Sequence, residues 1–226
     1  MNVIILAGGL GTRLRSVVSD LPKPMAPVHG KPFVQHLISW LLKFPVSKII
    51  FSVGYKKEII MDYFGEEYQG IPVVYAVEEE PLGTGGAIAN GLKYADEDYV
   101  LVINGDTYFP IDLNWFYLFH TENESEISIA LKPMYKFDRY GSVELNENDI
   151  IGFKEKAYLD EGLINGGIYF LEKEYFLSKS PDEKFSFETD ILEKAVLNQN
   201  IKGAVFNDPF IDIGIAEDYY KASEIL

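Results

Sequence analysis

The chain has 226 residues and a formal net charge of -15, with 47% hydrophobic residues, 24% charged residues and no cysteine. This size and composition are ordinary for one globular α/β domain with a proper core. The acidic balance argues against a nucleic-acid partner, because a phosphate backbone needs a basic face. The absence of cysteine excludes disulfides and thiolate metal sites. No apolar run reaches the roughly 18 residues of a membrane-spanning helix, and no signal peptide opens the chain. We therefore expect a cytoplasmic protein without membrane contact.

The chain opens with a predicted strand and a glycine-rich loop. The β-branched run Val3-Ile4-Ile5 indicates a buried strand, and Leu6-Ala7-Gly8-Gly9-Leu10-Gly11-Thr12-Arg13-Leu14 follows it. Glycine lets another group approach the backbone closely, so that successive N–H groups can surround an anion. Thr12 adds a hydroxyl, and Arg13 adds a permanently charged fork of donors suited to phosphate. The loop is neither a P-loop nor a dinucleotide fingerprint, and taken alone it could equally be a tight strand-to-helix turn.

A single lysine follows between two prolines, in Pro22-Lys23-Pro24-Met25. The prolines hold the backbone extended and would aim one ammonium group in a fixed direction. The alternative is a rigid loop with a solvated lysine.

Beyond this segment, hydrophobic spacing predicts helices over 32–44 and 56–64 and strands over 48–53 and 71–77. This alternation favours a parallel sheet with helices on both faces, whose ligands bind at the carboxyl ends of the strands.

A second glycine-rich turn follows the strand over 71–77 and opens a helix that ends near residue 93. Its sequence is Glu78-Glu79-Glu80-Pro81-Leu82-Gly83-Thr84-Gly85-Gly86-Ala87. We single out Glu80, because a carboxylate can accept hydrogen bonds from both N1–H and N2–H of guanine. It would also repel the acceptor edges of other bases. The alternative is that these glutamates form a solvated strand end.

Two aspartates follow apolar strands. The predicted strand over 99–103 ends in Asn104-Gly105-Asp106, and the chain closes on Phe210-Ile211-Asp212-Ile213-Gly214 before a helix over 216–225. Mg²⁺ takes one or two carboxylates together with substrate phosphates. Asp106 could also belong to a plain turn. An ionised Asp212 in an apolar strand is costly unless it is paired or metal-bound. We expect the final helix to serve packing only.

The alternation of strands and helices fades after about residue 131. A helix over 113–121 and a strand over 127–131 precede a predicted antiparallel pair over 140–145 and 150–154. Three polar motifs lie in this second half: Phe153-Lys154-Glu155-Lys156, Asn165-Gly166-Gly167-Ile168-Tyr169, and Phe187-Glu188-Thr189-Asp190, which opens a helix to about residue 198. Taken one at a time, each could equally be loop chemistry or a helix cap.

The glycine loop followed by Pro22-Lys23-Pro24-Met25 resembles the signature of the sugar-1-phosphate nucleotidyltransferases, and the resemblance covers nearly the whole chain. Within this family it is most similar to the D-glycero-α-D-manno-heptose 1-phosphate guanylyltransferases, which are short chains without a C-terminal extension. The resemblance implies an α/β fold, a Rossmann-like three-layer nucleotidyltransferase fold with a mixed, mostly parallel central sheet. It also implies a single domain over 1–226, with a nucleotide-binding part over about 1–131 and a sugar-phosphate-binding part over about 132–226.

The resemblance further implies transfer of a nucleoside monophosphate from GTP to D-glycero-α-D-manno-heptose 1-phosphate. The products would be GDP-heptose, for surface polysaccharide or glycan biosynthesis, and pyrophosphate, with Mg²⁺ as cofactor. The implied catalytic residues are Arg13, Lys23, Asp106 and Asp212, and both aspartates would bind the metal. The implied nucleotide-binding residues are Leu6, Gly8, Gly9, Gly11, Thr12, Arg13, Glu80, Pro81, Gly83, Thr84 and Gly105. The implied sugar-phosphate-binding residues are Gly141, Glu155, Lys156, Asn165 and Glu188.

Two other functions stay open at this point. A uridylyl-, thymidylyl- or cytidylyltransferase acting on another sugar 1-phosphate, such as N-acetylmuramate 1-phosphate, would share these motifs and differ in the base it selects. A non-catalytic nucleotide-sugar sensor would keep the fold, but it would have no physical need for Lys23, Asp106 and Asp212 together with Arg13. The sequence does not decide the oligomeric state, and a homo-oligomer is among the expectations.

Overall fold

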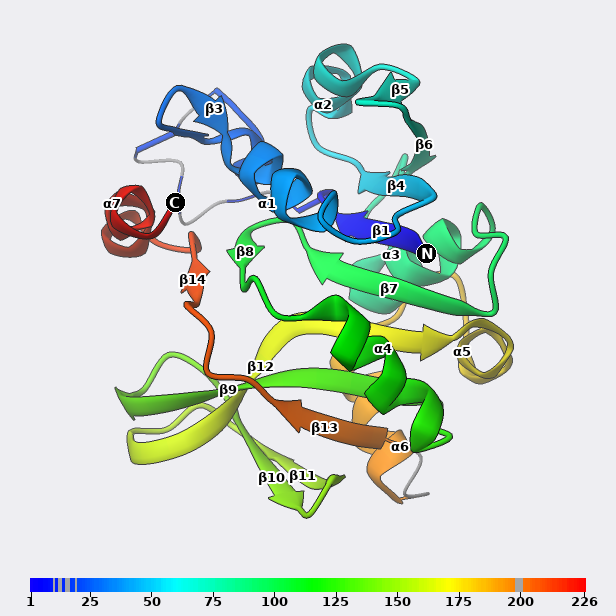
Figure 1. Cartoon of the computed structure of the whole chain (residues 1–226), viewed down its shortest axis with the longest axis vertical. Helices are drawn as coiled ribbons and strands as arrows, with labels where there is room; N and C mark the ends of the chain where they lie inside the picture. The colour runs from blue at the N-terminus through cyan, green and yellow to red at the C-terminus, as the bar shows by residue number, and fades with distance from the viewer. Residues whose placement is uncertain (10, 12–13, 15–16, 19, 198–200) are drawn as a thin grey trace.

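The computed structural model describes residues 1–9, 11, 14, 17–18, 20–197 and 201–226. Thr12 and Arg13, to which the sequence assigns triphosphate contacts, lie outside the described residues. One ten-stranded sheet runs through both halves of the chain (Figure 1), in the order β10-β11-β13-β9-β12-β7-β1-β4-β6-β5. The bounds of its strands are β1 (Asn2–Leu6), β4 (Lys48–Val53), β5 (Glu67–Tyr68), β6 (Ile71–Val77), β7 (Tyr99–Asn104), β9 (Ile127–Phe137), β10 (Ser142–Asn146), β11 (Asp149–Lys154), β12 (Leu159–Glu172) and β13 (Ile201–Val205).

The first half of the chain builds the parallel part of the sheet. Strands β7, β1, β4 and β6 pair in parallel, and the strands predicted over 48–53 and 71–77 are confirmed residue for residue as β4 and β6. Helices α1 (Phe33–Leu41), α2 (Lys57–Phe64) and α3 (Gly83–Leu92) connect these strands. Helix α1 ends before the predicted residue 44, because Pro45 disfavours helical backbone just ahead of it. The carboxyl ends of the four strands therefore lie along one edge of the sheet.

The predicted mixed sheet is confirmed, and so is the antiparallel pair predicted over 140–145 and 150–154, which forms as β10 and β11, but the prediction that the sheet is mostly parallel is wrong. Only the pairings β7–β1, β1–β4, β4–β6 and β13–β9 are parallel among the described strands, and the other neighbours are antiparallel. From β9 the chain continues through the β10–β11 hairpin and into β12, and no helix lies between these strands. Short turns of this kind can join only antiparallel strands, whereas parallel neighbours need a long connection. The sheet is therefore mixed, with antiparallel pairing dominant beyond β7.

Helices cover both faces of the sheet, which makes three layers. Side chains alternate along a strand, so Val3 and Ile5 face one core while Ile4 faces the other. Helices α1, α2 and α4 (Leu113–Glu122) pack on the first core. Helix α3 packs on the second core with α5 (Lys173–Lys179), the π-helical turn Glu188–Leu192 and α6 (Glu193–Leu197). None of the helices in the described part of the chain is long and apolar enough to cross a bilayer.

The end of the chain folds back onto its beginning. Strand β14 (Ile211–Asp212) pairs antiparallel with β8 (Thr107–Tyr108), just after β7. Helix α7 (Ala216–Ile225), confirmed with the predicted bounds, lies beside the hairpin of β2 (Pro27–Val28) and β3 (Lys31–Pro32) in Figure 1. A small third core joins these segments and includes Phe33, Ile213 and Ala222. Residues from the two ends of the sequence are thereby held at one edge of the sheet.

A buried histidine should make the stability of this fold depend on pH. His120 is fully buried, its Nδ1 lies 2.9 Å from Ser128 Oγ, and its Nε2 has no partner among the described residues. Burial lowers the pKa of His120 from 6.5 to about 4. The unfolded chain therefore binds more protons than the folded one between these values, and stability falls as the pH falls through this window. The difference corresponds to roughly 3 kcal/mol at most.

We expect His120→Gln to lose the pH-dependent contribution of this histidine to the free energy of unfolding. The unfolding free energy of the variant should therefore change less between pH 6.5 and pH 4.5 than that of the wild type. Urea unfolding followed by circular dichroism across this range measures the slopes. The matched control is His29→Asn, because His29 is exposed and has a positive φ that asparagine tolerates. An equal pH slope in His120→Gln and in the wild type would contradict the prediction.

Candidate functional site

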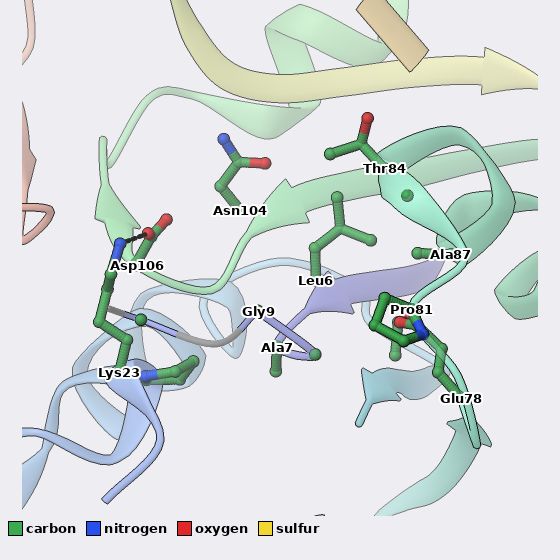
Figure 2. Close-up of a pocket in the computed structure, with 15 residues that line it drawn as sticks. Leu6, Ala7, Gly9, Lys23, Glu78, Pro81, Thr84, Ala87, Asn104 and Asp106 are labelled. Atoms are coloured by element: carbon green, nitrogen blue, oxygen red, sulfur yellow. Dashed lines mark hydrogen bonds and ion pairs between the residues drawn. The ribbon is translucent and has the colours of Figure 1, made fainter. Parts of the chain in front are cut away.

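A cavity of about 380 Å³ opens at the carboxyl ends of β1, β6 and β7 (Figure 2). Both glycine-rich turns contribute to its wall, as the strand order requires. Its lining residues are Leu6, Ala7, Gly8, Gly9, Gly11, Lys23, Pro24, Ser52, Glu78, Pro81, Gly83, Thr84, Ala87, Asn104 and Asp106. The wall is mostly backbone and small side chains on one side, with a lysine and two carboxylates around it. A planar ring and a chain of phosphates could both be accommodated in such a cavity.

Two glycines of the wall stand where an added Cβ would displace a neighbour, the Glu78 carboxylate at Gly8 and the backbone of Phe185 at Gly83. A Cβ on Gly8 would lie 2.6 Å from Glu78 Oε1. Gly83 has a φ of +75°, and a Cβ there would lie 2.5 Å from the backbone oxygen of Phe185. Phe185 in turn donates its N–H to Leu82 O at 3.0 Å. The glycine-rich turn before α3 is therefore in backbone contact with a segment of the second half of the chain.

The structure places Glu78 in the cavity wall, whereas Glu80 is exposed and is not among the lining residues. The Glu78 N–H donates to Val53 O at 2.8 Å and so continues the pairing of β6 by one residue. The Glu78 carboxylate accepts hydrogen bonds from Ser52 Oγ at 2.9 Å and from Leu82 N at 3.1 Å. These two donors fix its orientation at the cavity. The assignment of the base contact to Glu80 stays a prediction, while the residue of this acidic run that lines the cavity is Glu78.

Three residues from distant motifs meet beside this cavity. Lys23 Nζ lies 2.6 Å from Asp106 Oδ2 (Figure 2), and Lys23 begins a short 3₁₀ turn, Lys23–Met25, directly after Pro22. The pairing of β14 with β8 sets Asp212 opposite Thr107, and Ile213 N donates to Asp106 O at 3.0 Å. Burial raises the pKa of Asp212 and the charge of Asp106 raises it further, while Lys23 and the Gly214 N–H oppose this shift. The two carboxylates therefore repel each other in a partly desolvated position.

The aspartate pair is suited to a divalent cation. A hard ion such as Mg²⁺ prefers oxygen ligands, and it would relieve the repulsion that raises the pKa of Asp212. No group of three or more His, Asp or Glu side chains in the described part of the chain could hold an ion by itself. Water molecules and oxygen atoms of a bound phosphate would therefore complete the coordination of an ion at Asp106 and Asp212.

Two further cavities share Gly141, Lys156 and Asn165, and one of them is lined by Asp212. One, of about 390 Å³, is lined by Arg139, Tyr140, Gly141, Lys156, Asn165 and Asp212. The other, of about 340 Å³, includes Gly141, Glu155, Lys156, Asn165 and Glu188 in its wall. All five residues predicted to contact a sugar phosphate thus line one or both cavities. Asp106 lines the first cavity and Asp212 lines the 390 Å³ cavity, so the aspartate pair connects the two regions.

The two regions are also joined by a direct hydrogen bond. Thr84 Oγ1 donates to Glu188 Oε2 at 2.6 Å and accepts from Phe187 N at 2.9 Å. The sequence assigned Thr84 to the nucleotide and Glu188 to the sugar, and the structure brings them into contact. Sequence reasoning missed Glu78 and Arg139. The only signal for Arg139 was its position before Tyr140-Gly141, as one of three arginines in the sequence.

The chain is similar to a known protein family and to several characterised relatives. The chain matches the family model described as nucleotidyl transferase over residues 2–226. It is 49% identical over 226 residues to the D-glycero-alpha-D-manno-heptose 1-phosphate guanylyltransferase of Aneurinibacillus thermoaerophilus, covering 100% of this chain and 98% of the relative. It is 50% identical over 222 residues to the Campylobacter jejuni protein of the same name, covering 97% of each. The crystal structure of HddC from Yersinia pseudotuberculosis is similar with a TM-score of 0.88 and 42% identity, over 99% of this chain and 98% of that one. The same protein is also solved in complex with GMP-PN. From its sequence and its structure, the chain belongs to the nucleotidyl transferase family.

Proposed function

We propose that this protein transfers GMP from GTP to D-glycero-α-D-manno-heptose 1-phosphate and releases pyrophosphate. The observation that carries the transfer chemistry is the meeting of Lys23, Asp106 and Asp212 between a nucleotide-sized cavity and a second polar cavity. The two relatives with 49% and 50% identity support the choice of substrates, since both are named for this reaction. The product would be GDP-heptose, a donor for surface polysaccharide or glycan synthesis. Residues 1–226 would form one catalytic domain, with its nucleotide-binding part up to about residue 131.

The reaction needs little covalent help from the protein. A phosphate oxygen of the sugar 1-phosphate is already ionised, so it attacks the α-phosphorus without a general base while pyrophosphate leaves from the opposite side. Positioning and charge stabilisation then carry the catalysis. Lys23 would neutralise charge between the two phosphates, and the glycine loop with Thr12 and Arg13 would hold the departing pyrophosphate. Asp106 and Asp212 would hold Mg²⁺, which supplies Lewis-acid and template chemistry when it is bound.

The guanine base would be selected by Glu78 rather than by Glu80. A carboxylate oxygen has two lone pairs, and each Glu78 oxygen uses one of them for Ser52 or Leu82. The remaining lone pairs can accept from the N1–H and N2–H groups of guanine. A base with an acceptor on this edge, such as adenine or cytosine at its ring nitrogen, would meet a like partial charge. The proposed preference for GTP follows from this placement.

The test is pyrophosphate release with Mg²⁺ and GTP, UTP, CTP, dTTP or ATP, each paired with the heptose 1-phosphate and with hexose 1-phosphates. We expect turnover with GTP and the heptose 1-phosphate. Release only with UTP or dTTP would overturn the guanine assignment, and no release by folded protein with any pair would favour the sensor.

The same panel tests Glu78. Glu78→Gln replaces one acceptor oxygen by a donor, so kcat/KM for GTP should fall roughly 100-fold, as when a polar group of a specificity site is left unpaired. The matched control is Glu80→Gln, which removes the same charge two residues away on an exposed side chain and should leave kcat/KM within about twofold, as ordinary surface changes do. The reverse order of the two effects would return the base contact to Glu80.

A further inference from the structure

An arginine that no sequence motif predicted stands beside the aspartate pair. Arg139 lies between β9 and β10, and together with Tyr140 and Asp212 it lines two adjoining cavities of about 260 and 390 Å³. The larger of these also contains Lys156 and Asn165. Arg139 is thus a cation that shares both cavities with Asp212, and Lys23 lines neither of them. Its side chain is 35% exposed, so it can still meet a ligand.

The guanidinium of Arg139 is fixed from two sides. Its Nη1 donates to Asp218 Oδ2, and its Cζ lies 5.5 Å from the centre of the Tyr140 ring. Only one of the five N–H groups of the arginine is used for Asp218, so donors remain for a ligand. The Asp218 carboxylate is itself 13% exposed. A fork held in this way loses little conformational entropy when it binds, which is the condition for an effective anion contact.

Asp218 stands in the first turn of α7, and this helix is anchored to the hairpin that follows Lys23. Tyr219 Oη donates to Pro27 O at 2.5 Å, and His29 Nε2 lies 2.9 Å from Ser223 O. Helix α7 therefore contacts both the hairpin that follows the lysine turn and Arg139. The sequence predicted that this helix serves packing only, but its Asp218 also accepts a hydrogen bond from Arg139.

The negative charges around Asp106 and Asp212 would have to be neutralised by a cation when a sugar 1-phosphate binds. A sugar 1-phosphate brings negative charge toward Asp106 and Asp212 and toward a triphosphate, and like charges at short range disfavour binding. Lys23 is already engaged by Asp106 at 2.6 Å. Arg139 and Lys156 remain as the two cations that line the 390 Å³ cavity with Asp212. Arginine forms two parallel hydrogen bonds to a phosphate, whereas lysine acts as a point charge.

We propose that Arg139 binds the phosphate of the sugar 1-phosphate and that Asp218 is a positioning residue for it. This inference rests on the proposed function for the presence of a sugar 1-phosphate, but it does not depend on which base or which sugar is used. Glu188 and Asn165 would then meet the sugar on the far side of the same region.

Steady-state kinetics of the full chain with Arg139→Gln tests the proposal. The KM for the sugar 1-phosphate should rise roughly 10- to 100-fold, the loss expected for charge-assisted hydrogen bonds, while the KM for the nucleoside triphosphate stays within about twofold. Arg139→Lys should recover part of the loss, because it keeps the charge but not the fork. Asp218→Asn should raise the same KM by a smaller factor, since it leaves the guanidinium in place but loosens it.

The control variant is Glu224→Gln, which removes a charge from an exposed position of the same helix that lines neither cavity, and it should change neither KM. An unchanged KM for the sugar 1-phosphate in Arg139→Gln would overturn the proposal. So would an equal rise in both KM values with a lower melting temperature, which is what a purely structural clamp between α7 and the β9–β10 connection predicts. If the wild type uses a different pair of substrates, the proposed function fails, but the comparison is then made with the sugar 1-phosphate of that pair.

Discussion

Replacing Lys23 by alanine is expected to reduce turnover roughly 100-fold or more, the loss typical of a main transition-state charge partner. Lys23 Nζ lies 2.6 Å from Asp106 Oδ2 on the wall of the nucleotide cavity, and its side chain is only 14% exposed. As negative charge redistributes between the attacking phosphate and the leaving pyrophosphate, an ammonium group between them stabilises the transition state more than the ground state. We therefore expect kcat to fall while the KM for the triphosphate changes little.

The protein should stay folded in this variant. The Lys23 turn is held by backbone hydrogen bonds from Met25 N to Pro22 O at 2.8 Å and from Ala26 N to Lys23 O at 3.0 Å, which alanine keeps. Circular dichroism and thermal melting check this expectation. The matched control is Lys202→Ala, which breaks a similarly half-buried pair with Asp149 far from the cavity and should leave kcat unchanged. A Lys23→Ala enzyme with near-normal turnover would remove this lysine from the mechanism.

The parallel half of the sheet was predictable from sequence because each strand is followed by a helix with its own periodic pattern. Such a unit fixes both the direction of the next strand and the edge where its loops meet. The glycine loop and Asp106 could be assigned to one edge for this reason alone, whereas Lys23 was assigned to the site only through the family resemblance. The convergence of Asp212 on Asp106 required more, since β14 pairs with β8 across about half the chain.

The antiparallel half was not predictable in the same way. Strand β9 was predicted to end at residue 131, but it continues to Phe137 through residues that are partly exposed. Strand β13, whose sequence Ile201–Val205 includes a lysine and a glycine, was not predicted at all. Its central Gly203 is buried against Leu131 and Ile150, so its place is decided by packing with distant residues. Local patterns carry no information about such contacts.

The two side chains that sequence reasoning missed depend on single-residue geometry. Three consecutive glutamates follow β6, and only the hydrogen bond from Glu78 N to Val53 O shows which of them is still part of the strand. A shift of one residue would turn each side chain to the other face. Arg139 acquires its position through Asp218, a residue of α7 that no motif connects to it. The motifs and the family resemblance named candidate residues that the structure brings together, but they did not predict these contacts.

Replacing Asp212 by asparagine should abolish most activity and at the same time stabilise the free protein. The side chain of asparagine has nearly the same shape, and its Oδ1 can still accept from Gly214 N, a contact of 2.6 Å in the structure. It lacks the charge that would hold Mg²⁺ together with Asp106, so we expect turnover to fall roughly 1000-fold, in line with the loss of electrostatic and metal-ion stabilisation. The Mg²⁺ concentration for half-maximal activity should rise as well.

The expected gain in stability follows from the raised pKa of Asp212. Burial and the charge of Asp106 raise this pKa above its unfolded value, so the folded protein binds the proton more tightly than the unfolded chain does. The ionised carboxylate therefore destabilises the wild type above its folded pKa, and this cost is relieved as the pH falls through that pKa. The neutral amide has no such cost, so Asp212→Asn should melt at a higher temperature than the wild type at neutral pH without Mg²⁺, and this difference should shrink at acidic pH.

The control Asp182→Asn, at an exposed position, should change neither the melting temperature nor the turnover. A lower melting temperature or retained turnover in Asp212→Asn would show that this aspartate is a structural acceptor rather than a metal ligand.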